Sequence, residues 1–282
     1  MAAARVVRRR VTSIAAAMLV AALSACGHGG PGRDATAAGI ARAAGLDAGK
    51  SNGAAFDLQL YRRDDGKPGA LFVYIEGDGQ AYLDTHTPST DPTPADPLAL
   101  RLAAADSGPA VLYLGRPCQF ASGRADPRCS VRLWTTGRFG ADVVASIDDA
   151  IDHERARAPE RPLVLVGYSG GGVIAALVAA RRTDVSLLVT IAAPLDVADW
   201  TRRLGLSSLD GSQLPLDHAD RLSRVRQVAF AGQGDKVVPV ASITSAVAKF
   251  GPSAKLIIVP DFDHRCCWVR DWPHLRMVAS GE

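Results

Sequence analysis

Several features that would point to a particular class of protein are scarce in this chain of 282 residues. Aromatic residues make up 6% of it, and no segment repeats, which excludes a repeat architecture. The formal net charge is only +3, and four arginines lie within residues 5–10. Without them, 28 basic residues face 29 acidic ones, a net charge of −1. We therefore expect no basic surface for nucleic acid.

The N-terminus has the three parts of a secretory signal. Residues 5–10 are basic, residues 11–23 are apolar, and small residues lead to Cys26. The apolar run is shorter than the roughly 20 residues that a membrane-spanning helix needs. The segment resembles the lipobox of bacterial lipoproteins, which implies removal of residues 1–25 and acylation of Cys26. The alternatives are an ordinary signal peptide or a buried helix.

This resemblance implies an exported protein that is anchored to the cell envelope by lipid on Cys26. Residues 26–54 are rich in glycine and alanine, with one helical pattern over 35–46, and predict a flexible tether. The remaining residues 55–282 are enough for one large α/β domain.

The most informative stretch is LVLVGYSGGG at residues 163–172. Its apolar start predicts a buried strand of a parallel sheet, and the alanine-rich run 173–182 predicts a helix. Between them Gly167, Ser169 and Gly171 form the pattern G-x-S-x-G, in which a sharp turn exposes the serine hydroxyl. The alternative is a glycine-rich turn that contains a serine by chance.

With this motif, the chain resembles the α/β-hydrolase superfamily over about residues 55–275. The resemblance implies a mostly parallel sheet with helices on both faces and a small cap insertion at 195–225. The alternative for 195–225 is a surface excursion without substrate contact. Upstream, residues 56–62 predict an antiparallel edge strand, 64–69 a hairpin turn, and 71–75 the next strand.

The resemblance also orders a catalytic triad along the chain as Ser169, Asp235 and His264. His264 follows the last predicted strand and would accept the serine proton, and Asp235 would orient the imidazole. Asp196 is an alternative acid, whereas Asp261 and Asp263 are too close in sequence to His264 to orient it. The other histidines have less suitable positions: His28, His86, His153, His218 and His274.

Two backbone N–H groups are expected to bind the oxyanion. One belongs to Gly170, directly after the serine. The second is that of Asp78, or alternatively Gly79, after the strand at 71–75. Here Glu76-Gly77 replaces the His-Gly pair that is common in the superfamily, and the alternative is a plain acidic turn.

Four cysteines besides Cys26 can pair in three ways in an oxidising compartment. We favour Cys118–Cys129 with Cys266–Cys267, and cross-pairing is the competitor. Metal binding is not expected, because suitably spaced histidines are missing. Arg116 and Arg138 flank this region and would either bind an anionic substrate or pair with acids.

The sequence thus predicts an exported, membrane-tethered serine hydrolase that cleaves a small ester or amide without a cofactor. A non-catalytic binding lipoprotein on the same fold is an alternative. An acyltransferase or peptidase with the same triad is another. No lipase-type HGGG run is present, and nothing names the substrate.

Overall fold

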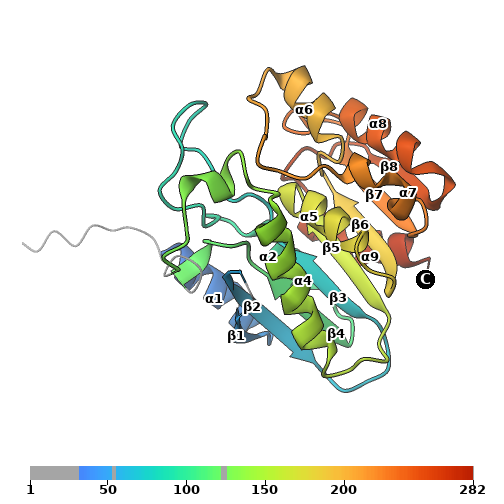
Figure 1. Ribbon diagram of the computed structural model, residues 1–282. Helices are drawn as coiled ribbons and strands as arrows, with labels where there is room; N and C mark the ends of the chain where they lie inside the picture. The colour runs from blue at the N-terminus through green and yellow to red at the C-terminus, as the bar shows by residue number, and fades with distance from the viewer. Residues whose placement is uncertain (1–31, 53–54, 122–125, 282) are drawn as a thin grey trace, which may run out of the picture. The chain divides into compact units, whose positions relative to one another are not determined.

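An eight-stranded sheet forms the centre of the computed structural model, which describes residues 32–52, 55–121 and 126–281 (Figure 1). The spatial order is β1-β2-β4-β3-β5-β6-β7-β8. The strands are β1 (Asp47–Asn52), β2 (Asp57–Asp64), β3 (Leu71–Ile75), β4 (Ala110–Leu114), β5 (Leu163–Tyr168), β6 (Val185–Ile191), β7 (Gln227–Gly232) and β8 (Ala254–Val259). Pairs β1–β2 and β2–β4 are antiparallel and the others are parallel, so the predicted mostly parallel sheet is confirmed.

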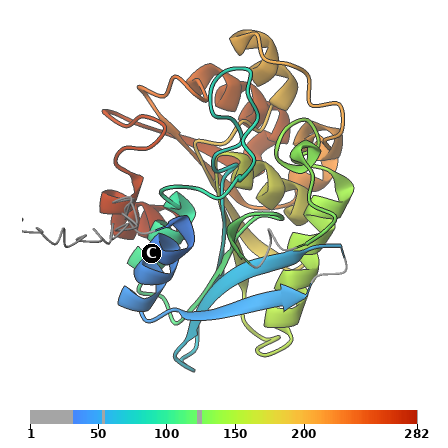
Figure 2. The ribbon, with the colours of Figure 1, turned by 90° about the vertical axis from the view of Figure 1, so that its left-hand side faces the viewer.

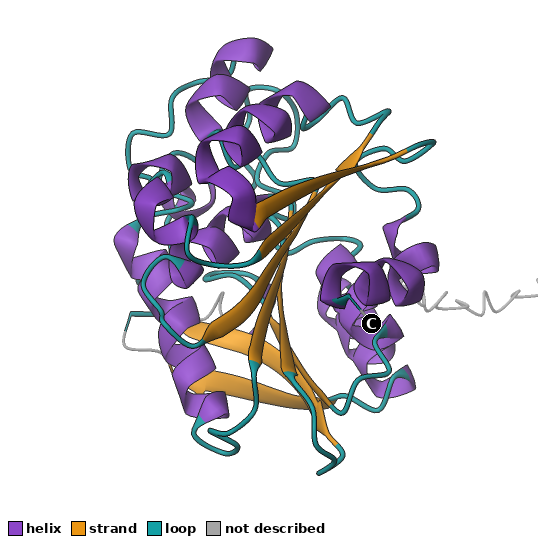
Figure 3. Cartoon of the chain, turned by 90° about the vertical axis from the view of Figure 1, so that its right-hand side faces the viewer, coloured by secondary structure: helices purple, strands orange, loops and turns teal. Residues whose placement is uncertain are grey.

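Helices cover both faces of the sheet, as Figure 3 shows. Apolar side chains of α4, α5 and α8 pack on one face, and those of α1, α2 and α9 pack on the other. Strands buried on both faces are therefore apolar throughout, as in β3 and β4. The helices are α1 (Arg33–Ala43), α2 (Leu98–Ala105), α4 (Ala141–Arg155), α5 (Gly170–Ala179), α6 (Val197–Leu204), α7 (Ala219–Leu222), α8 (Val240–Phe250) and α9 (Trp268–Ser280), with short 3₁₀ turns η1 (Val131–Trp134), η2 (Pro215–His218) and η3 (Gly251–Ser253).

The flexible tether predicted for 26–54 is wrong over most of its described part. Residues 33–52 belong to the same compact unit as the rest of the domain. Helix α1 buries Ala37 and Ala41, and β1 pairs along the whole edge of β2. Figure 2 shows both elements at that edge of the sheet. Strand β1 reads DAGKSN, and its backbone hydrogen bonds to β2 hold it without an apolar pattern.

The predicted pairing across the 64–69 turn is also wrong. Strand β4 lies between β2 and β3, so the two strands joined by that turn are not neighbours. Both β3 and β4 are fully buried, and inner positions in the sheet let each cover apolar surface on two faces. Strand β2 is not an edge strand, because β1 covers it.

The predicted signal peptide and Cys26 lie outside the described residues. Among the residues that are described, no helix combines the length and apolar character needed to cross a bilayer.

Candidate active site

Ser169 stands at the turn between β5 and α5, in a backbone conformation that few residues adopt. It has φ 51° and ψ −125° and serves as the N-cap of α5. A positive φ is strained for a residue with a side chain, and such strain gathers at functional sites. The N–H of Ser169 donates to the carbonyl oxygen of Ile191 at 2.8 Å, so the neighbouring strand β6 holds the turn in place.

Two glycines make this turn possible by allowing close backbone approach. A Cβ on Gly167 would lie 2.4 Å from the carbonyl oxygen of Gly171. A Cβ on Gly171 would lie 2.2 Å from the carbonyl oxygen of Ile75. Both distances are far below a van der Waals contact, which is the steric reason for glycine at both ends of G-x-S-x-G.

The structure brings together the three side chains that sequence reasoning placed in a triad. His264 Nε2 lies 3.1 Å from Ser169 Oγ, and His264 Nδ1 lies 2.8 Å from Asp235 Oδ2. The other carboxylate oxygen of Asp235 accepts the N–H groups of Val237 and Val238, each at 2.8 Å. These bonds fix the carboxylate, which is buried, and leave one oxygen for the imidazole.

The alternative acid, Asp196, lies in another environment. Its Oδ1 caps α6 by accepting the N–H of Asp199 at 3.0 Å, and its Oδ2 pairs with Lys249 Nζ at 2.7 Å. Burial alone would raise the pKa of Asp196, but these partners outweigh burial and lower it. Asp263 shapes the turn after His264, because its Oδ1 accepts the N–H groups of Arg265 and Cys266.

The two predicted oxyanion donors adjoin each other. A Cβ on Gly170 would lie 2.1 Å from Asp78 Oδ1, so the loop after β3 rests on the first residue of α5. Neither the N–H of Gly170 nor that of Asp78 donates a hydrogen bond to any group that the structure describes. Both N–H groups are therefore available to a ligand.

Two arginines hold the side chain of Asp78. Arg116 Nη1 donates to Asp78 Oδ1 at 3.1 Å, and Arg138 Nη1 donates to Asp78 Oδ2 at 2.7 Å. Burial by itself raises the pKa of Asp78, but the two guanidinium groups outweigh it and hold that pKa below its usual value. Pairing of the arginines with an acid, one of the two roles weighed from sequence, is therefore confirmed. Nothing in the sequence indicated that Asp78 is the acid with which they pair.

The carboxyl group of Glu76 is held by hydrogen bonds from the protein itself. This buried group accepts N–H groups from Gly77 (2.9 Å), Ala99 (3.3 Å) and Leu100 (3.4 Å), the last two in the first turn of α2. The Tyr113 hydroxyl donates to it as well, at 3.1 Å. Burial raises the pKa of Glu76 to about 7, despite these donors. The residue thus joins the loop after β3, which carries the predicted oxyanion donor Asp78 and is called the oxyanion loop below, to helix α2.

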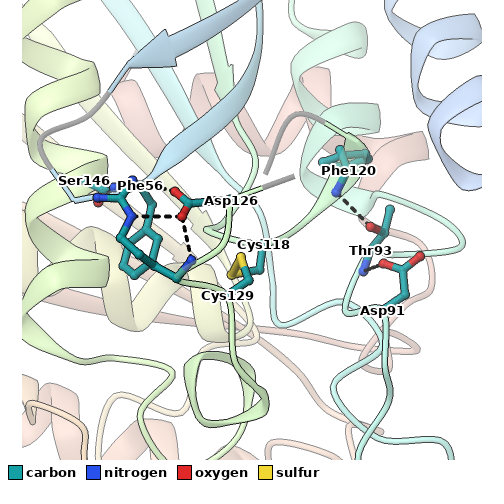
Figure 4. The surroundings of a disulfide bond; sticks show 9 residues. Phe56, Asp91, Thr93, Cys118, Phe120, Asp126, Cys129 and Ser146 are labelled. Atoms are coloured by element: carbon teal, nitrogen blue, oxygen red, sulfur yellow. Dashed lines mark hydrogen bonds and ion pairs between the residues drawn. A yellow bond between two sulfur atoms is a disulfide. The ribbon is translucent and has the colours of Figure 1, made fainter. Parts of the chain in front are cut away.

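A disulfide shapes the loop that carries Arg116. Cys118 and Cys129 are bonded, as favoured from sequence (Figure 4). Cys266 and Cys267 are bonded as well. Next to the first bridge, Gln119 Nε2 donates to the carbonyl oxygen of Gly77 at 3.0 Å. The loop after β4 therefore supports the loop that holds the second predicted oxyanion donor.

A cavity of about 430 Å³ opens above Ser169 and His264. A loop over residues 81–97 that contains four prolines contributes Tyr82 to its wall, and the 195–225 segment contributes Trp200. Trp200 is held by a 2.7 Å bond from its Nε1 to the carbonyl oxygen of Val237. This segment thus lines the site through Trp200, a contact that a cap insertion would make and a surface excursion without substrate contact would not.

A second cavity of about 960 Å³ adjoins the first and shares Tyr82, Arg138 and Trp200 with it. The 195–225 segment lines it with Leu204, Leu206 and Leu209. Among the described residues, no group of three or more His, Cys, Asp or Glu side chains is placed to hold a metal ion.

Solved structures share this architecture at low sequence identity. An esterase from Pyrococcus furiosus has a TM-score of 0.61 and 11% identity, covering 85% of this chain and 90% of its own. The chain has the α/β-hydrolase fold. An α/β serine hydrolase without lid from Xanthomonas campestris (TM-score 0.53, 16% identity) covers 84% of this chain and 92% of its own. An acylaminoacyl peptidase from Pyrococcus horikoshii (TM-score 0.58, 11% identity) aligns with 83% of this chain and with 39% of its own.

Sequence comparison does not assign this chain to a protein family. No protein-family model matches the chain. The tryptophan synthase alpha chain of Burkholderia mallei is 30% identical over 167 residues, or 56% of this chain. The chain spans 60% of that relative's length, so the likeness does not extend to the whole of that protein.

Proposed function

We propose that this protein is a serine hydrolase that cleaves an ester or amide bond through Ser169, His264 and Asp235. The observation that carries the proposal is the position of His264. Its imidazole bridges the hydroxyl of a strained serine (3.1 Å) and a buried carboxylate (2.8 Å). A serine hydroxyl is a weak nucleophile by itself, and an adjacent base held in one tautomer activates it.

In the proposed reaction, Ser169 Oγ attacks the substrate carbonyl while His264 Nε2 accepts its proton. The Nδ1–H of His264 donates to Asp235, which stabilises the imidazolium that forms. The N–H groups of Gly170 and Asp78 bind the oxyanion of the tetrahedral intermediate. His264 then protonates the leaving group, and water, deprotonated by the same imidazole, releases the acyl group from Ser169.

A small carboxylic ester is the substrate class that we favour. The cavity of about 430 Å³ above Ser169 suits a small molecule better than an extended chain. Esterases and an acylaminoacyl peptidase share the fold, so an amide is the alternative substrate class.

We also propose that the enzyme acts outside the cytoplasm, anchored to a membrane by lipid on Cys26. The signal pattern of residues 1–26 supports this location. The Cys118–Cys129 bridge supports it as well, because disulfides persist in oxidising compartments. Labelling of the full chain with a fatty acid, lost in Cys26→Ala, would test the anchor.

The decisive experiment measures hydrolysis of p-nitrophenyl acetate by the domain and by its Ser169→Ala variant. We expect the variant to lose nearly all activity and to keep the circular dichroism spectrum of the parent. A fluorophosphonate probe should label the parent only, since it reacts with activated serines. An unchanged hydrolysis rate in the variant would remove Ser169 from the mechanism. A parent protein without labelling or turnover would favour the non-catalytic binding protein. Product analysis separates hydrolysis from acyl transfer.

A further inference from the structure

Beside Ser169 two arginines share the carboxylate of Asp78, so these three groups together carry an excess of one positive charge. The charge of Glu76 also acts on Arg116, but with a pKa of about 7 that carboxyl group is only partly ionised at neutral pH. Both Arg116 and Arg138 pair with Asp78, and Arg116 Nη2 also donates to the carbonyl oxygen of Arg138. The side chains of Arg116 and Arg138 are 5% and 9% exposed. An excess charge in such a place is costly unless a partner of opposite sign binds there.

The two arginines differ in what their donors do. Arg116 spends both Nη groups on protein acceptors and does not line either cavity. Arg138 uses Nη1 for Asp78 and Nε for the carbonyl oxygen of Thr135, at 2.7 Å. Its Nη2 donates to no group that the structure describes. Arg138 also lies on the wall that the two cavities share.

The carboxylates that line the cavities have other partners. Asp78 is already shared between two arginines, and Glu76 accepts four hydrogen bonds from the protein. Asp96 pairs with Arg101 and lies 3.6 Å from Arg265 at the rim. Asp84, in the second cavity, accepts the N–H groups of His86 and Thr87.

We propose that Arg138 Nη2 binds an anionic oxygen group of the substrate, so that the substrate is an ester or amide carrying a carboxylate near the scissile bond. This rests on the proposed function and narrows its substrate class. Because Arg138 touches Asp78, whose side chain rests on Gly170, the anion lies close to the oxyanion donors. The rest of the substrate extends into the second cavity, beside Leu204 and Leu206.

Matched esters test whether the enzyme prefers an anionic substrate to a neutral one. The substrates are meta- and para-acetoxybenzoate, each compared with the neutral acetoxybenzamide of the same shape. The measured quantity is the ratio of kcat/KM for the anionic ester to kcat/KM for its neutral amide. For one of the two isomers this ratio should be about 10- to 100-fold higher in the wild type than in Arg138→Gln, because the variant lacks the charge-assisted hydrogen bond. Arg265→Gln is the control, because that arginine is 70% exposed at the rim and should leave the preference intact.

The role of Arg138 would be refuted if the wild type and Arg138→Gln have the same ratio of anionic to neutral kcat/KM for both isomers. It would also be refuted if Arg265→Gln removes the preference instead. Because Arg138→Gln leaves Asp78 with one partner, a second comparison sets Asp78→Asn/Arg138→Gln against Asp78→Asn. The two proteins of this pair differ only at Arg138 and have no carboxylate at position 78. The ratio of anionic to neutral kcat/KM should therefore again be lower in the protein that lacks Arg138.

Binding measured without turnover separates this inference from the proposed function. Isothermal titration of the acetoxybenzoates into Ser169→Ala should give about tenfold tighter binding than titration into Ser169→Ala/Arg138→Gln. The neutral amides should bind both variants alike. Equal affinity for the anions overturns the inference even if the wild type hydrolyses esters. A clear difference sustains it even if no ester is turned over. Acetoxyphenyl phosphate in the same titration distinguishes a carboxylate from a phosphate.

Discussion

The hydroxyl of Tyr168 donates a 3.0 Å hydrogen bond to the carbonyl oxygen of His264. Tyr168 directly precedes the candidate nucleophile, so the bond ties the turn after β5 to the loop after β8. The two rings also contact each other, with centroids 5.3 Å apart. Trp268 Nε1 donates to the same carbonyl at 3.2 Å, so the His264 loop is held from two sides.

Tyr168→Phe should therefore lower kcat modestly and leave the protein folded. One neutral hydrogen bond is lost while the ring contact and the Trp268 bond remain, which predicts a decrease of about two- to tenfold. Steady-state kinetics with p-nitrophenyl acetate would measure it. Tyr61→Phe, in β2 away from the cavity, is the matched control and should change kcat little. A loss of several orders of magnitude in Tyr168→Phe would give the hydroxyl a direct part in the chemistry.

Asp235 and Asp196 should respond differently to the same substitution. Asp235→Asn leaves His264 without an acceptor that stabilises its imidazolium, so kcat should fall by about 10³- to 10⁴-fold. Asp196→Asn keeps a side-chain oxygen for the cap of α6 but removes the charge that pairs with Lys249, so it should lower the melting temperature slightly and spare kcat. Thermal denaturation and kinetics on both variants decide the matter, and the opposite pattern would reverse the two roles.

Glu76 should make the free energy of unfolding depend on pH. Its pKa is about 7 in the fold against an ordinary value of 4.5, so between these values the folded state holds a proton that the unfolded state has released. The unfolding free energy should therefore fall as pH rises from 4.5 to 7, by up to about 3 kcal/mol.

Glu76→Gln removes this titration and keeps an acceptor for Gly77 and α2. Urea unfolding at several pH values should show a shallower decline for the variant than for the wild type. The two proteins should agree best below pH 4.5, where the wild-type carboxyl group is neutral in both states. Parallel pH profiles would mean that Glu76 does not carry the effect.

The Cys118–Cys129 bridge should contribute more stability than the Cys266–Cys267 bridge. It joins residues 11 apart, and closing such a loop in the unfolded chain corresponds to about 3 kcal/mol. Residues 1 apart close almost no loop. We expect Cys118→Ser/Cys129→Ser to lower the melting temperature clearly and Cys266→Ser/Cys267→Ser to lower it much less. Equal losses would show that chain entropy is not the main contribution.

The loop 118–129 should also influence catalysis through Gln119. This residue bonds the carbonyl oxygen of Gly77 and so supports the oxyanion loop. In Cys118→Ser/Cys129→Ser we expect kcat to fall while labelling by a fluorophosphonate probe persists, because the triad itself is not part of that loop. Loss of both would indicate a general disturbance of the fold.

The sequence alone determined the features that follow from local chemistry. A run of four apolar residues, a G-x-S-x-G turn and an alanine-rich run predict strand, strained serine and helix, and β5 and α5 have that form. The reason is steric, since only glycine at 167 and 171 allows the approach that the turn requires. The mostly parallel sheet was implied by the resemblance to the α/β-hydrolase superfamily that this motif carries, and the structure has it.

Only the tertiary structure decided which distant groups meet. Strand β1 has no apolar pattern and is held by backbone hydrogen bonds, so its composition suggested a tether. Asp235 rather than Asp196 contacts His264, although both follow strands of the same sheet. The pairing of Asp78 with Arg138 joins residues 60 apart. Such contacts depend on how the strands are ordered and how loops pack at their ends, which no local pattern of residues records.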